Sequence, residues 1–230
     1  MKAIFKTNRI VVIATCLLML FSTLSINVKA EEYDNYEFVA FITQCIENEK
    51  TISVLEKNGE DVTLQTKSEI LRLYELNDYE TLENYLNDNE YSISFIRDSN
   101  SSEVSRAFAV KTYTKRTPRS KTATAYVAGY EPKTATANWA SIMSCDFSYN
   151  VNTYKIGNIY PTKITLESYF VSPDTGIAQL LGVSTPLATK SADGLSLTVT
   201  ATYTLVADHQ YFPFPQLNFG TYTDQGVARA

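Results

Sequence analysis

The first part of the chain has the hydrophobic spacing of α-helices. Apolar side chains recur every three or four positions, at Phe38, Phe41, Ile42, Cys45 and Ile46. Residues with this spacing lie along one face of a helix, so the pattern predicts a first helix that buries the stripe. Asp34, followed three residues later by Glu37, has the spacing of a capping box and marks the expected start of this helix.

Two further helices are expected in the same part of the chain. A second helix is predicted over residues 68–76, where Ile70, Leu73 and Tyr74 share one side. A third follows it, and its apolar side carries Leu82, Tyr85 and Leu86. Asn77, with Glu80 three residues later, predicts a capping box at the start of the third helix.

The chain between the first and second helices contains a turn at Asn58-Gly59. The flanking residues 52–55 and 62–64 are suited to the two short strands of a hairpin, but the glycine could equally end a lengthened first helix. We favour a hairpin or a loop. Residues 91–96 alternate between apolar and polar side chains, which predicts a short strand.

Beyond residue 107 the period of the pattern changes from that of helices to two. The clearest strand covers residues 195–205, where threonine or serine alternates with Leu, Val, Ala or Tyr. Further strands are expected at residues 108–114, 122–130, 134–149, 153–159 and 163–171. The sequence therefore predicts an α+β protein: a small acidic helical N-terminal region, then an antiparallel all-β sandwich-like domain or a small open barrel.

Two details refine the picture of the β region. Lys-Thr-Ala-Thr-Ala occurs at residues 121–125 and again at 133–137, which predicts two adjacent strands of similar character. Trp139 lies in the longest predicted strand and is expected in the core, with a platform for stacking a ligand as the alternative. Residues 211–215 are aromatic and contain two prolines, so they cannot form a central strand. They are expected to plug one end of the sandwich or to form a recognition surface.

The first thirty residues have the layout of a secretory signal peptide. Lys2, Lys6 and Arg9 precede an apolar run at residues 10–26, and Val28 and Ala30 supply the small residues of a cleavage site. A membrane anchor is the alternative, but the apolar run is shorter than the roughly 20 residues that span a bilayer. We therefore expect an exported bacterial protein, secreted or associated with the cell wall.

Formal charge divides the 230 residues into three blocks. Residues 1–30 carry four basic residues and no acidic one, residues 31–105 have a net charge of −13, and residues 106–230 have a net charge of +4. The predicted organisation is thus a signal peptide (1–30), an acidic and mainly helical region that could be a pro-region (31–105), and a β domain (106–230). Its entry segment, residues 106–121, has six basic residues and no acidic one.

The basic entry segment has four possible roles. It could be a linker and a first strand with a solvated face, or it could dock on the chain's own acidic segment. It could bind an anionic cell-wall polymer or a membrane surface through Lys111, Lys115, Arg116, Arg119 and Lys121, with Tyr126 and Tyr130 nearby. It could also be a processing site, cut after Arg106 or Arg116. The net charge of residues 31–230 is −9, which argues against nucleic acid as a partner.

Cysteines and catalytic motifs contribute little. Cys45 and Cys145 are either buried thiols or one disulfide. The sequence contains a single histidine, His209, and no Gly-x-Ser-x-Gly motif of a serine hydrolase. Asp174-Thr175-Gly176 resembles the catalytic tripeptide of aspartic proteases, but it occurs once, whereas those enzymes need a pair of carboxylates. We therefore expect this tripeptide to form a turn. Phosphate-binding glycine motifs, a zinc ligand set and an EF-hand loop are also missing, so no cofactor or metal is expected.

These patterns favour a non-enzymatic secreted or cell-surface binding module. Its Tyr- and Thr-rich strands are suited to polar contacts with a protein or a glycan at the cell surface. One alternative is a pore-forming or antimicrobial protein released from an acidic pro-region, because long strands with alternating Ser and Thr are amphipathic. Another is a hydrolase that depends on carboxylates. No pattern singles out one ligand.

Overall fold

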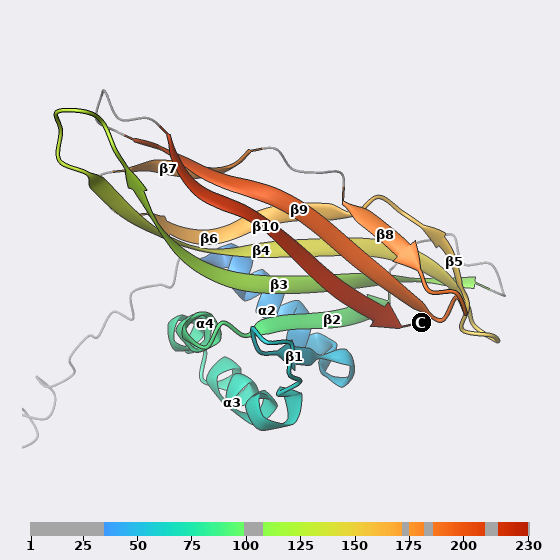
Figure 1. Ribbon diagram of the computed structural model, residues 1–230. Helices are drawn as coiled ribbons and strands as arrows, with labels where there is room; N and C mark the ends of the chain where they lie inside the picture. Colours follow the sequence, from blue (N-terminus) through green and yellow to red (C-terminus); the bar gives the residue numbers. More distant parts are fainter. Residues whose placement is uncertain (1–34, 99–107, 172–174, 182–185, 210–215, 230) are drawn as a thin grey trace, which may run out of the picture. The chain divides into compact units, whose positions relative to one another are not determined.

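The computed structural model describes residues 35–98, 108–171, 175–181, 186–209 and 216–229 (Figure 1). The side chains of residues 168–181, 208 and 209 are not described. The predicted signal peptide, the polar segment before residue 108 and the aromatic residues 211–215 lie outside these ranges. So do Arg106 and Asp174.

The stripe of residues 38–46 forms helix α2 (Tyr36–Glu47), and Phe38, Phe41, Ile42 and Cys45 are buried as predicted. The helix is capped by Asn35, whose side chain accepts a hydrogen bond of 3.1 Å from the Phe38 backbone N–H. An amide oxygen satisfies this free N–H as well as a carboxylate does. The helix therefore starts one residue later than the predicted cap at Asp34.

Short elements occupy the segment between α2 and α3. A 3₁₀ turn, η1 (Glu49–Thr51), precedes strand β1 (Ser53–Leu55). The turn at Asn58-Gly59 is present, and Gly59 N–H donates to Glu56 O over 2.9 Å. The predicted strand at residues 62–64 is wrong, because helix α3 (Thr63–Glu75) begins there, five residues before its expected start. Asp61 accepts from the Thr63 N–H at 2.9 Å and so begins the helix locally.

The junction of α3 with α4 (Tyr79–Asp88) differs from the prediction by one residue. Asn77 adopts a left-handed conformation with φ 55° and ends α3, as its N–H donates to Tyr74 O at 3.0 Å. Asp78 then caps α4 by accepting from the Thr81 N–H at 3.2 Å. Asn77 is therefore a C-terminal signal for one helix and not the predicted cap of the next.

Sheet A contains strands from both charge blocks. Its order is β1–β2–β3–β4–β5, and β6 also pairs with β4. The bounds are β2 (Ser92–Asp98), β3 (Phe108–Ala125), β4 (Lys133–Asn150), β5 (Ile156–Ile159) and β6 (Lys163–Val171). The strands expected at residues 108–114 and 122–130 are one strand of 18 residues, so the described part of the basic segment is a strand and not a linker. The two Lys-Thr-Ala-Thr-Ala copies pair with each other, as predicted.

Sheet B is built from the last part of the chain. It has the order β10–β9–β7, with β8 also pairing with β9. The bounds are β7 (Thr175–Leu181), β8 (Leu187–Lys190), β9 (Ser196–His209) and β10 (Leu217–Arg229). The alternation predicted for β9 is confirmed from Leu197 on, since Leu197, Val199, Ala201, Tyr203 and Leu205 are all buried. Leu195, which was expected on the same face, precedes the strand and is exposed. The sequence did not predict β7, β8 or β10. Thr175 and Gly176 begin β7 instead of forming a turn.

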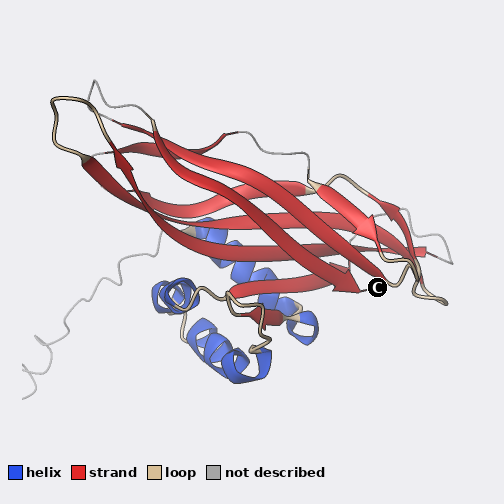
Figure 2. Cartoon of the chain, in the orientation of Figure 1, coloured by secondary structure: helices blue, strands red, loops and turns tan. Residues whose placement is uncertain are grey.

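The two sheets and the helices form three layers (Figure 2). Sheets A and B pack face to face through two apolar clusters, one centred on Tyr113, Phe147 and Val199 and the other on Trp139, Leu205 and Phe219. The helices cover the opposite face of sheet A, where α2 contacts β6 and α4 contacts β3. The sheets are not closed into a barrel.

The change of charge near residue 105 falls within sheet A. Strand β2, from the acidic block, pairs along β3, from the basic block, between Ile93–Arg116 and Asp98–Lys111. Residues 35–230 belong to one compact unit. Release of residues 31–105 as a pro-region would therefore remove β1, β2 and the helices from this unit.

Candidate binding groove

The basic side chains of β3 point to opposite faces of sheet A. Successive side chains of a strand alternate, so Arg116 faces the helices while Lys115 and Arg119 face sheet B. Lys111 lies 4.3 Å from the centre of the Tyr149 ring, and Lys121 is exposed. Of the two predicted tyrosines, Tyr126 is 75% exposed and Tyr130 is 58% exposed. These residues do not gather into one binding surface.

Arg116 is fully buried and joins the helices to sheet A. Its Nε donates to Glu167 of β6, and its Nη2 donates to Glu83 of α4 over 3.3 Å. Nη1 donates to Asn87 Oδ1 at 3.1 Å, and the guanidinium lies 5.0 Å from the centre of the Phe38 ring. A contact between the basic segment and the acidic segment is thus present at this residue. Cleavage after Arg116 would require β3 to leave the sheet, because its side chain is 0% exposed.

Glu167 is the most deeply buried carboxylate of this cluster. Burial raises the pKa of Glu167 above its ordinary value, while Arg116 opposes the shift, and the charges of Glu83 and Glu37 add to it. Its Oε1 atom has no hydrogen-bond partner among the described residues. The side chain is 0% exposed, so it is out of reach of a dissolved substrate and holds the layers together.

Arg119 forms the corresponding cluster between the two sheets. It donates to Asp224 of β10, and Ser141 of β4 donates to the other carboxylate oxygen of Asp224. Trp139 Nε1 donates to the Tyr203 hydroxyl at 3.2 Å beside them. Trp139 is 2% exposed, which confirms the core position that the sequence predicts.

Cys45 and Cys145 are free thiols, so of the two alternatives the buried thiols are found and the disulfide between them is not formed. Cys45 lies on the buried stripe of α2, whereas Cys145 belongs to the apolar cluster between the sheets. Sheet A therefore stands between the two sulfur atoms. Burial raises the pKa of both thiols, which keeps them protonated and unreactive.

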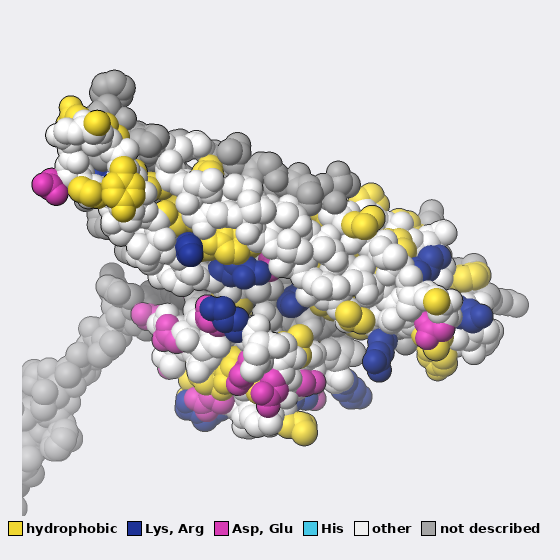
Figure 3. Space-filling view, in the orientation of Figure 1, with side chains coloured by type: hydrophobic (Ala, Val, Ile, Leu, Met, Phe, Trp, Pro, Cys, Tyr) yellow, Lys and Arg dark blue, Asp and Glu magenta, His cyan; other side chains and the backbone are white. Residues whose placement is uncertain are grey.

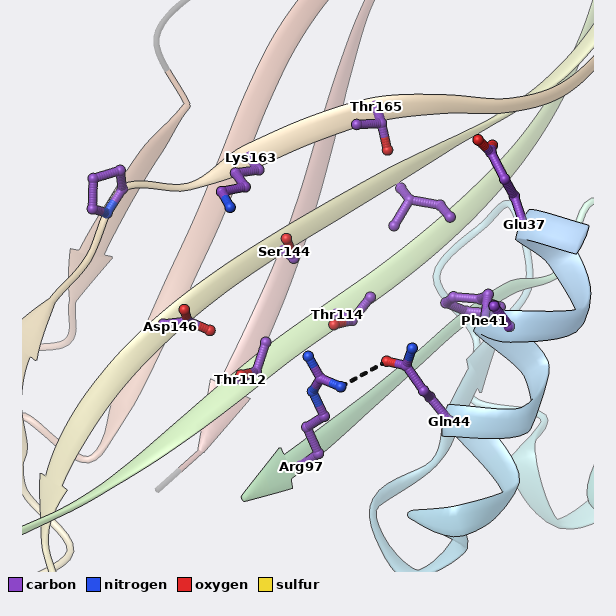
Figure 4. A pocket seen from close by; sticks show the side chains of 13 residues that line it. Glu37, Phe41, Gln44, Arg97, Thr112, Thr114, Ser144, Asp146, Lys163 and Thr165 are labelled. Carbon is purple, nitrogen blue, oxygen red and sulfur yellow. Dashed lines mark hydrogen bonds between the residues drawn. The ribbon is translucent and has the colours of Figure 1, made fainter. Parts of the chain in front are cut away.

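A polar groove lies between α2 and the helix-facing side of sheet A (Figure 4). It has a volume of about 440 Å³. Four hydroxyl groups line the sheet side, those of Thr112 and Thr114 on β3, Ser144 on β4 and Thr165 on β6. Phe41, Ala40, Ile142 and Pro161 supply its apolar part. Histidine and cysteine are absent from its described lining.

The charged side chains of the groove are balanced in sign. Arg97 and Lys163 are positive, and Glu37 and Asp146 are negative. Arg97 Nη1 donates to Gln44 Oε1 of α2 over 2.9 Å (Figure 4). The ion pairs found between described residues do not include Glu37, Asp146 or Lys163.

The two carboxylates of the groove do not face each other. Figure 4 shows Glu37 on α2 at one end and Asp146 on β4 toward the other. The groove thus offers hydrogen bonds and charges for binding.

None of the residues that the sequence analysis selected for binding lines this groove. The sequence gives a weak indication of Thr112 and Thr114 as groove residues. Both are polar, and both stand an even number of positions from Arg116 in a segment that alternates, so all three share a face of the strand. The alternation shows that they share a face of β3. It does not show that α2 stands over that face and leaves a gap.

No protein-family model, curated protein or solved structure matches this chain. None of the described helices is long and apolar enough to cross a membrane. Within the described ranges, no three side chains of the His, Cys, Asp or Glu type come together as a metal site.

Proposed function

We propose that this protein is an exported, non-enzymatic binding module and that the groove between α2 and sheet A is its ligand site. The ligand class we assign is a glycan that carries polar or charged substituents. The observation that carries this proposal is the lining of the groove, in which four hydroxyl groups on three neighbouring strands lie beside two charged groups of each sign.

The hydroxyl groups are held at regular positions by the sheet. Neighbouring strands are about 4.8 Å apart, so Thr114, Ser144 and Thr165 present their hydroxyls at a fixed spacing across β3, β4 and β6. A hydroxyl both donates and accepts hydrogen bonds, as the hydroxyls of a sugar do. Because the backbone is already paired in the sheet, little ordering is required when a ligand binds.

The balance of charges in the groove restricts the class of ligand that it favours. Two cations and two carboxylates give the lining no net charge, so a strongly anionic cell-wall polymer gains little there. A glycan with amide, amine or carboxylate substituents can pair with Lys163 and Asp146 while its hydroxyls contact the threonines. This property favours the substituted glycans of a cell surface.

Calorimetric titration of the folded protein with soluble cell-wall glycan fragments tests the proposal. Binding should weaken at least tenfold in Lys163→Ala and in Ser144→Ala, since each removes a hydrogen-bonding group from the groove. Lys57→Ala is the matched control, because Lys57 is an exposed lysine that pairs with Glu90 away from the groove. Equal affinities in all four proteins, or no binding of any fragment, would overturn the assignment.

A further inference from the structure

A cluster of exposed apolar side chains lies at the end of the two sheets where β5 and β8 are found (right in Figure 1). We define the loop-end patch as the exposed residues Phe108, Val151, Tyr154, Lys155, Lys190 and Leu195. Phe108 is 42% exposed, Tyr154 is 56% exposed and Leu195 is 43% exposed. Figure 3 shows apolar, basic and acidic side chains together at this end.

Backbone and side-chain contacts connect the three chain segments that form this patch. The backbone of Gly157 lies against the Phe108 ring, and Ile156 N–H donates to Gly194 O over 2.8 Å. The Lys155 side chain reaches Gly194, and Lys190 Nζ donates to Gly157 O at 2.8 Å. The start of β3, the turn before β5 and the turn before β9 are therefore neighbours in space.

Tyr154 is held in this exposed position at a conformational cost. Its φ of 55° is in the left-handed region, which a bulky side chain rarely adopts. Its ring stacks on Tyr149 with centroids 6.5 Å apart, and Lys111 lies over the Tyr149 ring. A tyrosine whose backbone is strained, and whose ring is supported on one side and exposed on the other, is poorly explained by packing alone.

We infer that the loop-end patch docks on the surface of a bilayer that contains anionic lipids. Exposed apolar side chains grouped at one place mark an interaction surface. Tyrosine and phenylalanine favour the interface of a membrane, where an apolar ring and polar neighbours are both satisfied. The two lysines of the patch, Lys155 and Lys190, outnumber the one carboxylate of the turn, Asp193, so the patch attracts anionic headgroups.

The apolar members of the patch distinguish a bilayer from an anionic polymer. A dissolved polyanion is attracted by the lysines, but it offers no apolar phase in which Leu195, Val151 and Phe108 can be buried. A bilayer does both. The patch and the groove share no residue, so the membrane inference does not depend on whether the groove binds a glycan.

Vesicle co-sedimentation of the folded protein tests the inference. We expect binding to vesicles with 30% phosphatidylglycerol in phosphatidylcholine, and at least tenfold weaker binding to phosphatidylcholine alone. Leu195→Ser and Tyr154→Ser should each weaken binding to the anionic vesicles about tenfold. The double variant Lys155→Gln/Lys190→Gln should weaken it to a similar degree and reduce its dependence on salt.

Tyr126→Ser is the matched control, because Tyr126 is an exposed tyrosine at the turn between β3 and β4. This variant should bind the anionic vesicles as the parent protein does. Unfolding curves of each variant establish that the fold is retained. The inference is overturned if the parent does not sediment with anionic vesicles, or if Tyr126→Ser loses as much binding as Tyr154→Ser. It is also overturned if the lysine variant loses binding while Leu195→Ser does not, because the patch would then recognise a polyanion.

Discussion

The two faces of β3 each hold an arginine that is paired with a buried carboxylate, but the two arginines differ in exposure and in their number of partners. Arg116 and Arg119 are three residues apart, and each pairs with a carboxylate that is almost fully buried, Glu167 in one case and Asp224 in the other. Arg116 is 0% exposed and has additional polar partners on α4. The Arg119 side chain is 26% exposed, so water can share in its solvation.

The difference shows how burial sets the number of partners that a charge requires. Removing a guanidinium from water entirely costs several kcal/mol, which one carboxylate rarely offsets. Arg116 accordingly meets two carboxylates, an amide and an aromatic ring, contributed by both the helices and sheet A. Burial lowers the pKa of Arg119, but Asp224 and Tyr203 together more than compensate, and the net direction is upward. Each arginine connects sheet A to a different layer.

Arg116→Met should have the largest effect on stability. It leaves Glu167 buried without its partner, and breaking a buried pair on one side typically costs about 3–5 kcal/mol of unfolding free energy. Urea unfolding measures this loss. The double variant Arg116→Met/Glu167→Leu should recover much of it, because it removes both fully buried charges. A loss below about 1 kcal/mol in the single variant would show that the cluster does not hold the helices on the sheet.

Gly226→Ala should come next, on the face of β3 that carries Arg119. A Cβ at Gly226 of β10 would overlap the hydroxyl and ring of Tyr113 on β3. Overpacking of this kind costs about 1–3 kcal/mol. The double variant Tyr113→Leu/Gly226→Ala should lose less unfolding free energy than the two single variants lose together. Urea unfolding of Gly226→Ala, Tyr113→Leu and the double variant measures this difference. Additive losses would contradict the close approach of β10 to β3.

Arg119→Met should cost less than Arg116→Met. Asp224 keeps its hydrogen bond from Ser141, and water can approach the partly exposed position, so we expect a loss of about 1–2 kcal/mol. Comparison of the two methionine variants under the same conditions is the direct test. Equal losses would mean that burial does not distinguish the two faces.

Glu167 should make stability depend on pH. Burial, opposed by Arg116, raises the pKa of Glu167 above its ordinary value of 4.5, so the folded state holds this proton more tightly than the unfolded chain does. The contribution of Glu167 to the unfolding free energy is therefore fully present below pH 4.5, and it is lost as the pH rises through the folded-state pKa. Relative to Glu167→Gln, the parent protein should lose unfolding free energy as the pH rises from 4.5 to 7.5. A rise over that range would contradict the direction of the shift.

Reducing agent should have the smallest effect. Cys45 and Cys145 are buried free thiols on opposite faces of sheet A, so the melting temperature should not change with added dithiothreitol. Thiol labelling should be slow in the native state and rapid in urea. A reductant-dependent fall in melting temperature would indicate a disulfide and a different arrangement of the two faces.

Much of the local structure could be predicted from the sequence. The stripe in α2 and the alternation in β9 were confirmed, because both depend only on the geometry of a helix or a strand. The helix starts were wrong by one residue at Asp34 and Asn77, where neighbouring polar residues compete for the same cap. Strand β10 was missed because Gly220 and Gly226 interrupt its pattern. The second glycine is explained only by Tyr113 packing against it.

The candidate site depended much more on tertiary structure. The parity of residues 116 and 119 already places the two arginines on opposite faces of a strand, and the parity of Thr112 and Thr114 places them with Arg116. The sequence by itself determined these faces, because alternation is a property of the strand. Only the tertiary structure decided that helices cover one face and sheet B the other, and that α2 leaves a polar groove. The physical reason is that burial, pairing and cavities arise between elements distant in sequence, whose spacing no local pattern records.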